Sequence, residues 1–206
     1  MQDKFVISVG CEYGCFGPEI GKMIAKDFGI AYYDRELIDE IIEEAGFSKE
    51  LTAALAEAGL DIRGKAADVS NTAGGPTKYA NLTERVVYVQ SEVIKKLADR
   101  GSCVFIGRCS DYILRERTNC LNVFIYAPKE IRIQNVMDAH SLTRKDAMLL
   151  IQKNDEMLHA RYKQMTGTYR GDRHNRHLMI DSNLLGLEGT VKLIEEVAEK
   201  VFGGKE

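Results

Sequence analysis

A glycine-rich turn between a strand-like run and a helix-like run constrains this chain more than any other feature. The strand-like run Phe5–Val9 passes into Gly10–Gly17, and an amphipathic helix is predicted from Glu19 to Phe28. The N–H groups at a helix N-terminus attract anions, and glycines let the backbone approach a phosphate closely. Pro18 fits, because the first helical position needs no N–H. The segment predicts an anion-binding loop, with a purely structural turn as the alternative.

Strand-like and helix-like runs alternate along the rest of the chain. The strand-like runs are Phe5–Val9, Ala31–Tyr33, Cys103–Ile106, Leu121–Tyr126 and His177–Ile180. The helix-like runs are Glu19–Phe28, Arg35–Ala45, Thr83–Arg100, one that begins at Pro128, and Leu187–Phe202. This alternation predicts an α/β fold in which helices cover a parallel sheet.

Two glycine-containing stretches, Gly59–Asn81 and Met165–Arg176, interrupt the alternation. Long loops within a compact domain are usually functional lids or disordered segments. We therefore predict a mobile insertion over 59–81 and a lid over 155–176. The Met165–Arg176 part of the lid is expected to be mobile without ligand, because like charges crowd it.

The composition indicates one soluble domain over residues 1–206. A hydrophobic fraction of 45% is enough for a core of its own. The first ten residues place Asp3 and Lys4 before a short apolar run, which predicts a cytoplasmic protein without a signal peptide or a membrane span. The five cysteines are predicted to be reduced thiols. Cys11 and Cys15 lack a second ligand pair for zinc, so no resident metal is expected.

Charge is unevenly distributed along the chain. The net charge of -3 argues against a general nucleic-acid coat, so no nucleic-acid partner is expected. Between Arg161 and His177, however, five Lys and Arg residues oppose Asp172 alone, which gives five minus one, or +4. This stretch is predicted to meet a phosphate-rich ligand.

Several further segments carry a family resemblance when they are joined to the first loop. These segments are Tyr33–Ile38, Gln90–Ile94, Gly107–Leu114, Phe124–Pro128, Asp181–Asn183 and Gly186–Gly189. In this order and spacing the chain resembles the cytidylate kinase-like family over nearly its whole length. The resemblance implies a P-loop kinase-like three-layer fold with a five-stranded parallel sheet and mobile acceptor-binding and lid segments. It also implies transfer of the γ-phosphoryl group of ATP, with Mg²⁺, to a nucleoside monophosphate such as CMP.

The resemblance assigns residues to each side of the reaction. The donor phosphates would be held by Gly14, Cys15, Phe16, Gly17 and Glu19, and the adenine side would include Arg132 and Ser182. Glu19 would touch Mg²⁺ through water, although its role as a dipole partner of its own helix is favoured. A solvated helix face is the alternative for Arg132.

The acceptor side and the catalytic charges depend mainly on arginines. The acceptor would be held by Asp34, Arg35, Arg108 and Asp111, and the catalytic residues would be Arg108, Arg161 and Arg170. A guanidinium can clamp a phosphate with two parallel hydrogen bonds. The alternatives are an N-cap role for Asp34 and a surface ion pair for Arg108.

The chain departs from the family pattern at two places. Pro18 stands where the family usually carries a basic residue, and Glu156–Leu158 replaces basic residues of the lid helix. Because each such charge can contribute 10³ or more to the rate, a slow or altered kinase is one expectation. Two alternatives remain: a catalytically weakened nucleotide-binding protein, and an RNA-contacting or assembly module that uses residues 161–177. The sequence does not predict the oligomeric state.

Overall fold

The computed structural model describes residues 4–42 and 76–203. They form two units, one within Met1–Asp34 and Ala98–Glu206 and the other within Arg35–Leu97. The first unit holds the sheet, and the second holds α2 (Arg35–Ile42) and most of α4 (Pro76–Arg100). In this described part of the chain, no helix is both long and apolar enough to cross a membrane. One domain over 1–206 stays a prediction.

All strands of the described sheet run parallel. They are β1 (Val6–Cys11), β2 (Ala31–Tyr33), β3 (Cys103–Ile106), β4 (Cys120–Tyr126) and β5 (Leu178–Asp181), and they lie in the order β2-β3-β1-β4-β5. In the central strand β1, Val9 pairs with Ile106 of β3. The glycine-rich loop after β1 and Arg108 after β3 therefore follow the carboxyl ends of neighbouring strands, which is where ligands bind in open α/β sheets. The predicted fold class is confirmed.

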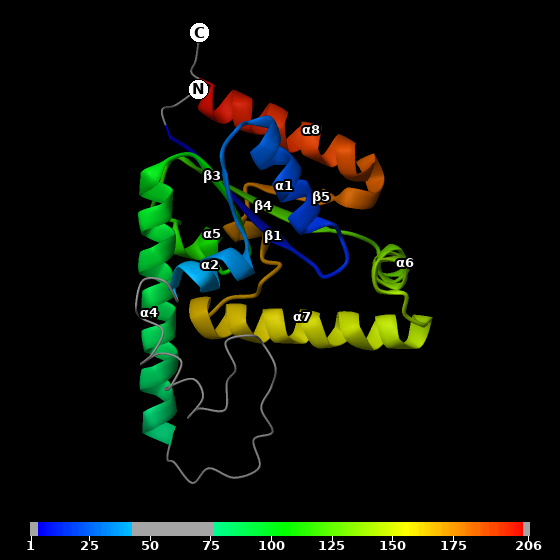
Figure 1. Cartoon of the computed structure of the whole chain (residues 1–206), viewed down its shortest axis with the longest axis horizontal. Coiled ribbons are helices and arrows are strands. Elements are labelled where there is room, and N and C mark those ends of the chain that lie inside the picture. The colour runs from blue at the N-terminus through cyan, green and yellow to red at the C-terminus, as the bar shows by residue number, and fades with distance from the viewer. Residues whose placement is uncertain (1–3, 43–75, 204–206) are drawn as a thin grey trace. The chain divides into compact units, whose positions relative to one another are not determined.

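Side chains of β1 alternate between the two faces of the sheet. Ile7 and Val9 are fully buried in the core formed with α1 (Gly17–Asp27) and α8 (Ser182–Phe202), which lie side by side in Figure 1. Ser8 lies on the other face, and its hydroxyl is 2.7 Å from the hydroxyl of Ser110 in the short helix α5 (Ser110–Ile113). Successive side chains of a strand point to opposite faces of the sheet. Because both faces of β1 are packed, the orientation of its end, which leads into the loop, is fixed.

A second hydrophobic cluster joins α6 (Lys129–His140) to α7 (Arg144–Thr166). Its buried members are Ile133, Val136, Ala147 and Ile151. Tyr13 of the glycine-rich loop packs against this cluster. Thr143 caps α7 by accepting a hydrogen bond from the N–H of Asp146 at 3.2 Å. The loop is therefore packed against both α6 and α7.

Two helices begin earlier than predicted. The motif Gly74-Gly75-Pro76 favours a loop up to Asn81, but α4 begins at Pro76, so residues 76–81 are helical and the predicted helix start at Thr83 is wrong. The mobility of this segment stays a prediction. Proline is favoured in the first turn of a helix, which accounts for the start. Residues 59–75 of that prediction lie outside the described residues. Helix α8 begins at Ser182, although Gly186, with φ 66° and ψ -178°, interrupts it just before the predicted start at Leu187.

Gly21 lets α1 approach β3 closely. A Cβ atom at this position would lie 2.3 Å from Cδ1 of Ile106. We expect Gly21→Ala to lower the free energy of unfolding by about 1–3 kcal/mol in urea denaturation, because overpacking outweighs the gain in helix propensity. Ile106→Val removes the clashing atom, so the double variant should cost less than the sum of the two single variants. Simple additivity would show that this contact does not limit the approach of α1.

Candidate functional site

The carbonyl groups of the glycine-rich loop are held from outside its own strand and helix. The carbonyl oxygens of three successive residues accept hydrogen bonds from side chains of α6 and α8. That of Tyr13 accepts from Arg132 Nη1 at 3.2 Å, that of Gly14 from Asn135 Nδ2 at 2.8 Å, and that of Cys15 from Ser182 Oγ at 3.2 Å. The carbonyl of Cys11 accepts from Nη2 of Arg170. These contacts fix the orientation of the peptide groups between β1 and α1.

The same peptide groups direct their N–H groups away from these contacts. In a planar trans peptide, the carbonyl and the following N–H point in opposite directions, so the N–H groups of Gly14, Cys15 and Phe16 face the other side. Over the residues that the structure describes, none of these three N–H groups has a hydrogen-bond partner. Gly14 and Phe16 have φ angles of 85° and 61°. Left-handed residues in such a turn make concave anion-binding nests.

Asp155, in the part of α7 predicted to belong to a lid, connects this helix to the loop. Its Oδ1 accepts from the N–H of Tyr13 at 3.1 Å, and its Oδ2 lies 2.6 Å from Nη1 of Arg132. Glu12 Oε2 lies 3.3 Å from Nε of the same arginine. Arg132 is only 9% exposed, so the solvated helix face considered as its alternative is wrong. An adenine contact for Arg132 stays a prediction. In the structure its guanidinium contacts the loop through the Tyr13 carbonyl.

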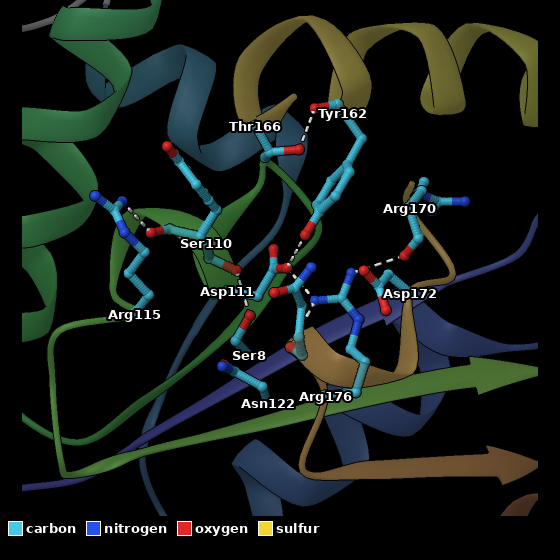
Figure 2. A network of polar contacts seen from close by, with 12 residues as sticks. Ser8, Ser110, Asp111, Arg115, Asn122, Tyr162, Thr166, Arg170, Asp172 and Arg176 are labelled. Carbon is cyan, nitrogen blue, oxygen red and sulfur yellow. Dashed lines mark hydrogen bonds and ion pairs between the residues drawn. The ribbon is translucent and has the colours of Figure 1, made fainter. Parts of the chain in front are cut away.

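A buried polar network joins α5, α7 and the segment before β5. Figure 2 shows Asp111, Tyr162 and Arg176 pointing toward one another. The Tyr162 hydroxyl donates to Asp111 Oδ2 at 2.7 Å, and Nη1 of Arg176 donates to the same oxygen. The side chains of Arg176 and Asp111 are 2% and 9% exposed. Burial and the Asp111 charge raise the pKa of Tyr162, so its hydroxyl remains a donor.

This network also positions Arg170. Nη2 of Arg176 donates to the carbonyl oxygen of Arg170 at 2.9 Å, while the guanidinium of Arg170 reaches Cys11 at the end of β1. Figure 2 shows Arg170 beside Arg176. Two of the five basic residues between Arg161 and His177 thus make contacts inside the protein. The guanidinium groups of Arg170 and Arg176 therefore contact oxygens within the chain, which leaves fewer charges of this stretch for an external ligand.

The charges of the three predicted catalytic arginines all act on the Cys109 thiol. Burial raises the pKa of Cys109 to about 11, with Asp111 contributing, whereas the charges of Arg161, Arg170 and Arg108 oppose the rise. Of these three arginines, Arg170 contacts the glycine-rich loop directly through the carbonyl of Cys11, and Arg108 follows the carboxyl end of β3. Their catalytic roles stay predictions.

The comparison with protein families agrees with this geometry. A model of the cytidylate kinase-like family matches residues 6–184. The chain belongs to this family. No curated protein gives a match.

Solved structures share the fold of this cytidylate kinase-like chain at low sequence identity. An uncharacterized protein from Eubacterium ventriosum is 20% identical with a TM-score of 0.73, over 95% of this chain and 99% of that one. A shikimate kinase from Bacteroides thetaiotaomicron is 14% identical with a TM-score of 0.51, over 95% and 98%. A gluconokinase from Sinorhizobium meliloti is 12% identical with a TM-score of 0.50, over the full length of both chains. These similarities show the α/β kinase fold.

The remaining predicted residues of this cytidylate kinase-like chain have other surroundings. Burial, and after it the charge of Asp34, raises the pKa of Tyr32, whose hydroxyl donates to the Pro18 carbonyl at 3.5 Å. Arg35 belongs to the second unit and forms an ion pair with Asp39, with Nε and Oδ2 3.8 Å apart. Glu19 is exposed in the first turn of α1, next to Gly17. The acceptor and donor roles of these residues stay predictions.

The sequence analysis missed Asn135 and Asp155. Asn135 follows Arg132 by three residues, so both lie on one face of α6, and this spacing was a usable signal. Asp155 gave no such signal, because its partner Tyr13 is 142 residues away along the chain. The predicted lid residues were cations, whereas the contact that joins α7 to the loop comes from a carboxylate.

Proposed function

We propose that this chain is a nucleoside monophosphate kinase that transfers the γ-phosphoryl group of ATP to CMP or a similar nucleotide. The observation that carries the proposal is the row of N–H groups of Gly14, Cys15 and Phe16 at the start of α1. Their peptide groups are oriented by donors on α6 and α8, which leaves these N–H groups available to the donor phosphates. Membership of the cytidylate kinase-like family supports phosphoryl transfer as the reaction class.

Positive charge beside this loop supports the same reaction. Phosphoryl transfer needs positioning and compensation of charge more than covalent chemistry from the protein. We assign Arg108 to the acceptor phosphate, and Arg161 and Arg170 to the migrating group. Mg²⁺ would arrive with ATP and be held mainly by phosphate oxygens and water, and Glu19, exposed in the first turn of α1, is the carboxylate that fits such an outer contact.

A nucleotide-binding protein with weakened turnover is the second candidate. Pro18, in the first turn of α1, has neither an N–H nor a positive charge to offer a phosphate. On the lid helix, the Glu156 carboxylate accepts from Gln152 Nε2 at 2.8 Å, and the apolar Met157 is 42% exposed. Both positions therefore lack the charge that the resemblance implies. The RNA-contacting alternative has less support, because Arg170 and Arg176 make internal contacts.

One screen separates these candidates. The pure protein is incubated with ATP, Mg²⁺ and each ribo- and deoxyribonucleoside monophosphate in turn, and ADP release and ATP-dependent thermal stabilisation are both measured. For a kinase we expect ADP to form above the acceptor-free rate with CMP or a related monophosphate. Stabilisation by ATP without ADP formation with any acceptor would select the weakened binder. If neither ADP formation nor thermal stabilisation by ATP is observed, both candidate functions are contradicted.

A further inference from the structure

A single ion pair contacts both backbone polar groups of Tyr13 in the glycine-rich loop. Asp155 Oδ1 accepts a hydrogen bond from the Tyr13 N–H at 3.1 Å, and Nη1 of Arg132 donates to the Tyr13 carbonyl oxygen at 3.2 Å. The two side chains also contact each other, with Asp155 Oδ2 2.6 Å from Nη1 of Arg132. Asp155 belongs to α7 and Arg132 to α6, so two helices outside the loop hold one residue of its backbone.

This ion pair determines where the row of N–H groups proposed for the phosphates begins. The N–H of Tyr13 points to α7 and donates to a carboxylate, so it is not available to a phosphate. The carbonyl of Tyr13 points to Arg132, and in a planar trans peptide the N–H of Gly14 then points the opposite way. The row therefore begins at Gly14, and its first N–H group is oriented by the ion pair of Asp155 and Arg132.

The surroundings of Tyr13 keep this arrangement in place. Its side chain packs against the hydrophobic cluster that joins α6 to α7, and its hydroxyl lies 3.2 Å from Nε2 of His140 at the end of α6. Hydrogen bonds between ionised groups are shorter and stronger than those between neutral groups, as the 2.6 Å contact between Asp155 and Arg132 illustrates. The backbone and the side chain of Tyr13 are thus both held by the same two helices.

The negative charge of Asp155 is unfavourable for the ligand that this loop is proposed to bind. A carboxylate beside the donor phosphates repels them, because like charges raise the free energy when they lie close together. Arg132 does not offset this repulsion, because it faces both Asp155 and Glu12, and one positive charge minus two negative charges leaves -1. The benefit of a carboxylate at this position therefore comes from the hydrogen bonds that it accepts and not from its charge.

We propose that Asp155 is a positioning residue for phosphate binding, which acts with Arg132 through the backbone of Tyr13; this role rests on the proposed function. One carboxylate oxygen accepts from the loop and the other contacts the guanidinium. An amide at this position cannot replace both contacts, because its NH₂ group would face either the Tyr13 N–H or the Arg132 guanidinium, which are both donors. Loss of the carboxylate lets the peptide group between Tyr13 and Gly14 rotate, and the Gly14 N–H then leaves the row.

The sign of the effect of Asp155→Asn tests this role. The variant removes a negative charge beside the proposed anion site, so electrostatics alone predicts tighter phosphate binding. We expect instead that the affinity for inorganic tripolyphosphate, measured by calorimetric titration of the full chain, falls about tenfold or more, the loss expected from one hydrogen bond to a charged group. An unchanged or higher affinity would overturn the proposal.

Two further variants separate geometry from charge. Glu156→Gln is the matched control, because it removes the same charge from the next position of α7, where Glu156 accepts from Gln152 of the same helix at 2.8 Å. It should leave the tripolyphosphate affinity unchanged or slightly higher. Asp155→Glu keeps the charge but displaces the carboxylate by one methylene group, so it should weaken binding as Asp155→Asn does. It also keeps the test decisive if Asp155→Asn does not fold, which thermal unfolding curves reveal.

ATP and turnover separate this role from an adenine contact and from the proposed function. In Asp155→Asn, the affinities for ATP and tripolyphosphate should fall by the same factor, and KM should rise for ATP but not for the monophosphate. A loss for ATP alone would assign the effect to the adenine side and contradict the proposal. If the unchanged chain binds tripolyphosphate but releases no ADP, the kinase function fails while the variants still decide the role of Asp155. If it binds no tripolyphosphate, the positioning role is overturned.

Discussion

Asp111→Ala is expected to lower the free energy of unfolding by about 3–5 kcal/mol, because it leaves the buried charge of Arg176 without its partner. The Tyr162 hydroxyl loses its acceptor in the same variant. Urea denaturation followed by circular dichroism measures the effect. The loss should appear as a lower midpoint with an unchanged slope.

Two further variants test whether burial of the Arg176 charge causes this loss of stability. Arg176→Met in the Asp111→Ala background should recover part of the loss, since no buried charge then remains. Glu130→Ala removes one partner of an exposed ion pair with Arg144, whose side chains are 68% and 57% exposed, and should change stability by less than about 1 kcal/mol. Equal losses for Asp111→Ala and Glu130→Ala would mean that the network around Arg176 is solvated.

Arg108→Ala is expected to lower kcat/KM for the monophosphate by about 10³-fold, through a higher KM and a lower kcat. The guanidinium supplies both charge and alignment to the acceptor phosphate in the proposed site. Arg108→Lys keeps the charge but not the planar fork, so it should mainly raise KM. ATP affinity should stay close to that of the unchanged chain, because the donor phosphates are assigned to the Gly14–Gly17 turn. The measurement pairs acceptor kinetics with ATP titration on each variant.

Arg115→Ala is the matched control for Arg108. Arg115 is half exposed and donates to the Tyr112 carbonyl within its own turn at 2.9 Å, so its removal should leave acceptor kinetics unchanged. A thermal unfolding curve for each variant checks the fold. Unaffected acceptor kinetics in Arg108→Ala, or failure of that variant to fold, would assign Arg108 a structural role.

The sheet could be predicted from sequence because its signal is local. The run Ala31–Tyr33 and the run Cys103–Ile106 match β2 and β3 in full, since buried parallel strands are short β-rich segments between turn residues. The position of Arg108 at the carboxyl edge of the sheet could be predicted for the same reason. It depends only on where β3 ends and on the parallel direction of the strands. The start of α4 at Pro76 carried a local signal as well, but the preceding glycine pair favoured a loop.

The polar contacts of the site could not be predicted, because they join distant parts of the chain. Arg176 meets Asp111 across 65 positions, and Arg132 meets Asp155 across 23. From sequence alone, an arginine in a basic stretch is expected to be solvated, and only the folded chain supplies the carboxylate that permits its burial. The inward contacts of Arg170 and Arg176 were missed for this reason.

The helices that orient the glycine-rich loop do so through its backbone. Arg132, Asn135 and Ser182 donate to main-chain oxygens, which every amino acid carries. The shape of the turn is therefore encoded partly outside the turn, in addition to the packed Tyr13 and the buried Cys15 within it. Exchanging Phe16, which is 37% exposed, should be tolerated better than exchanging Asn135, a residue that no loop motif contains. A search for related loops would gain from matching these three distant donors rather than the spacing of glycines.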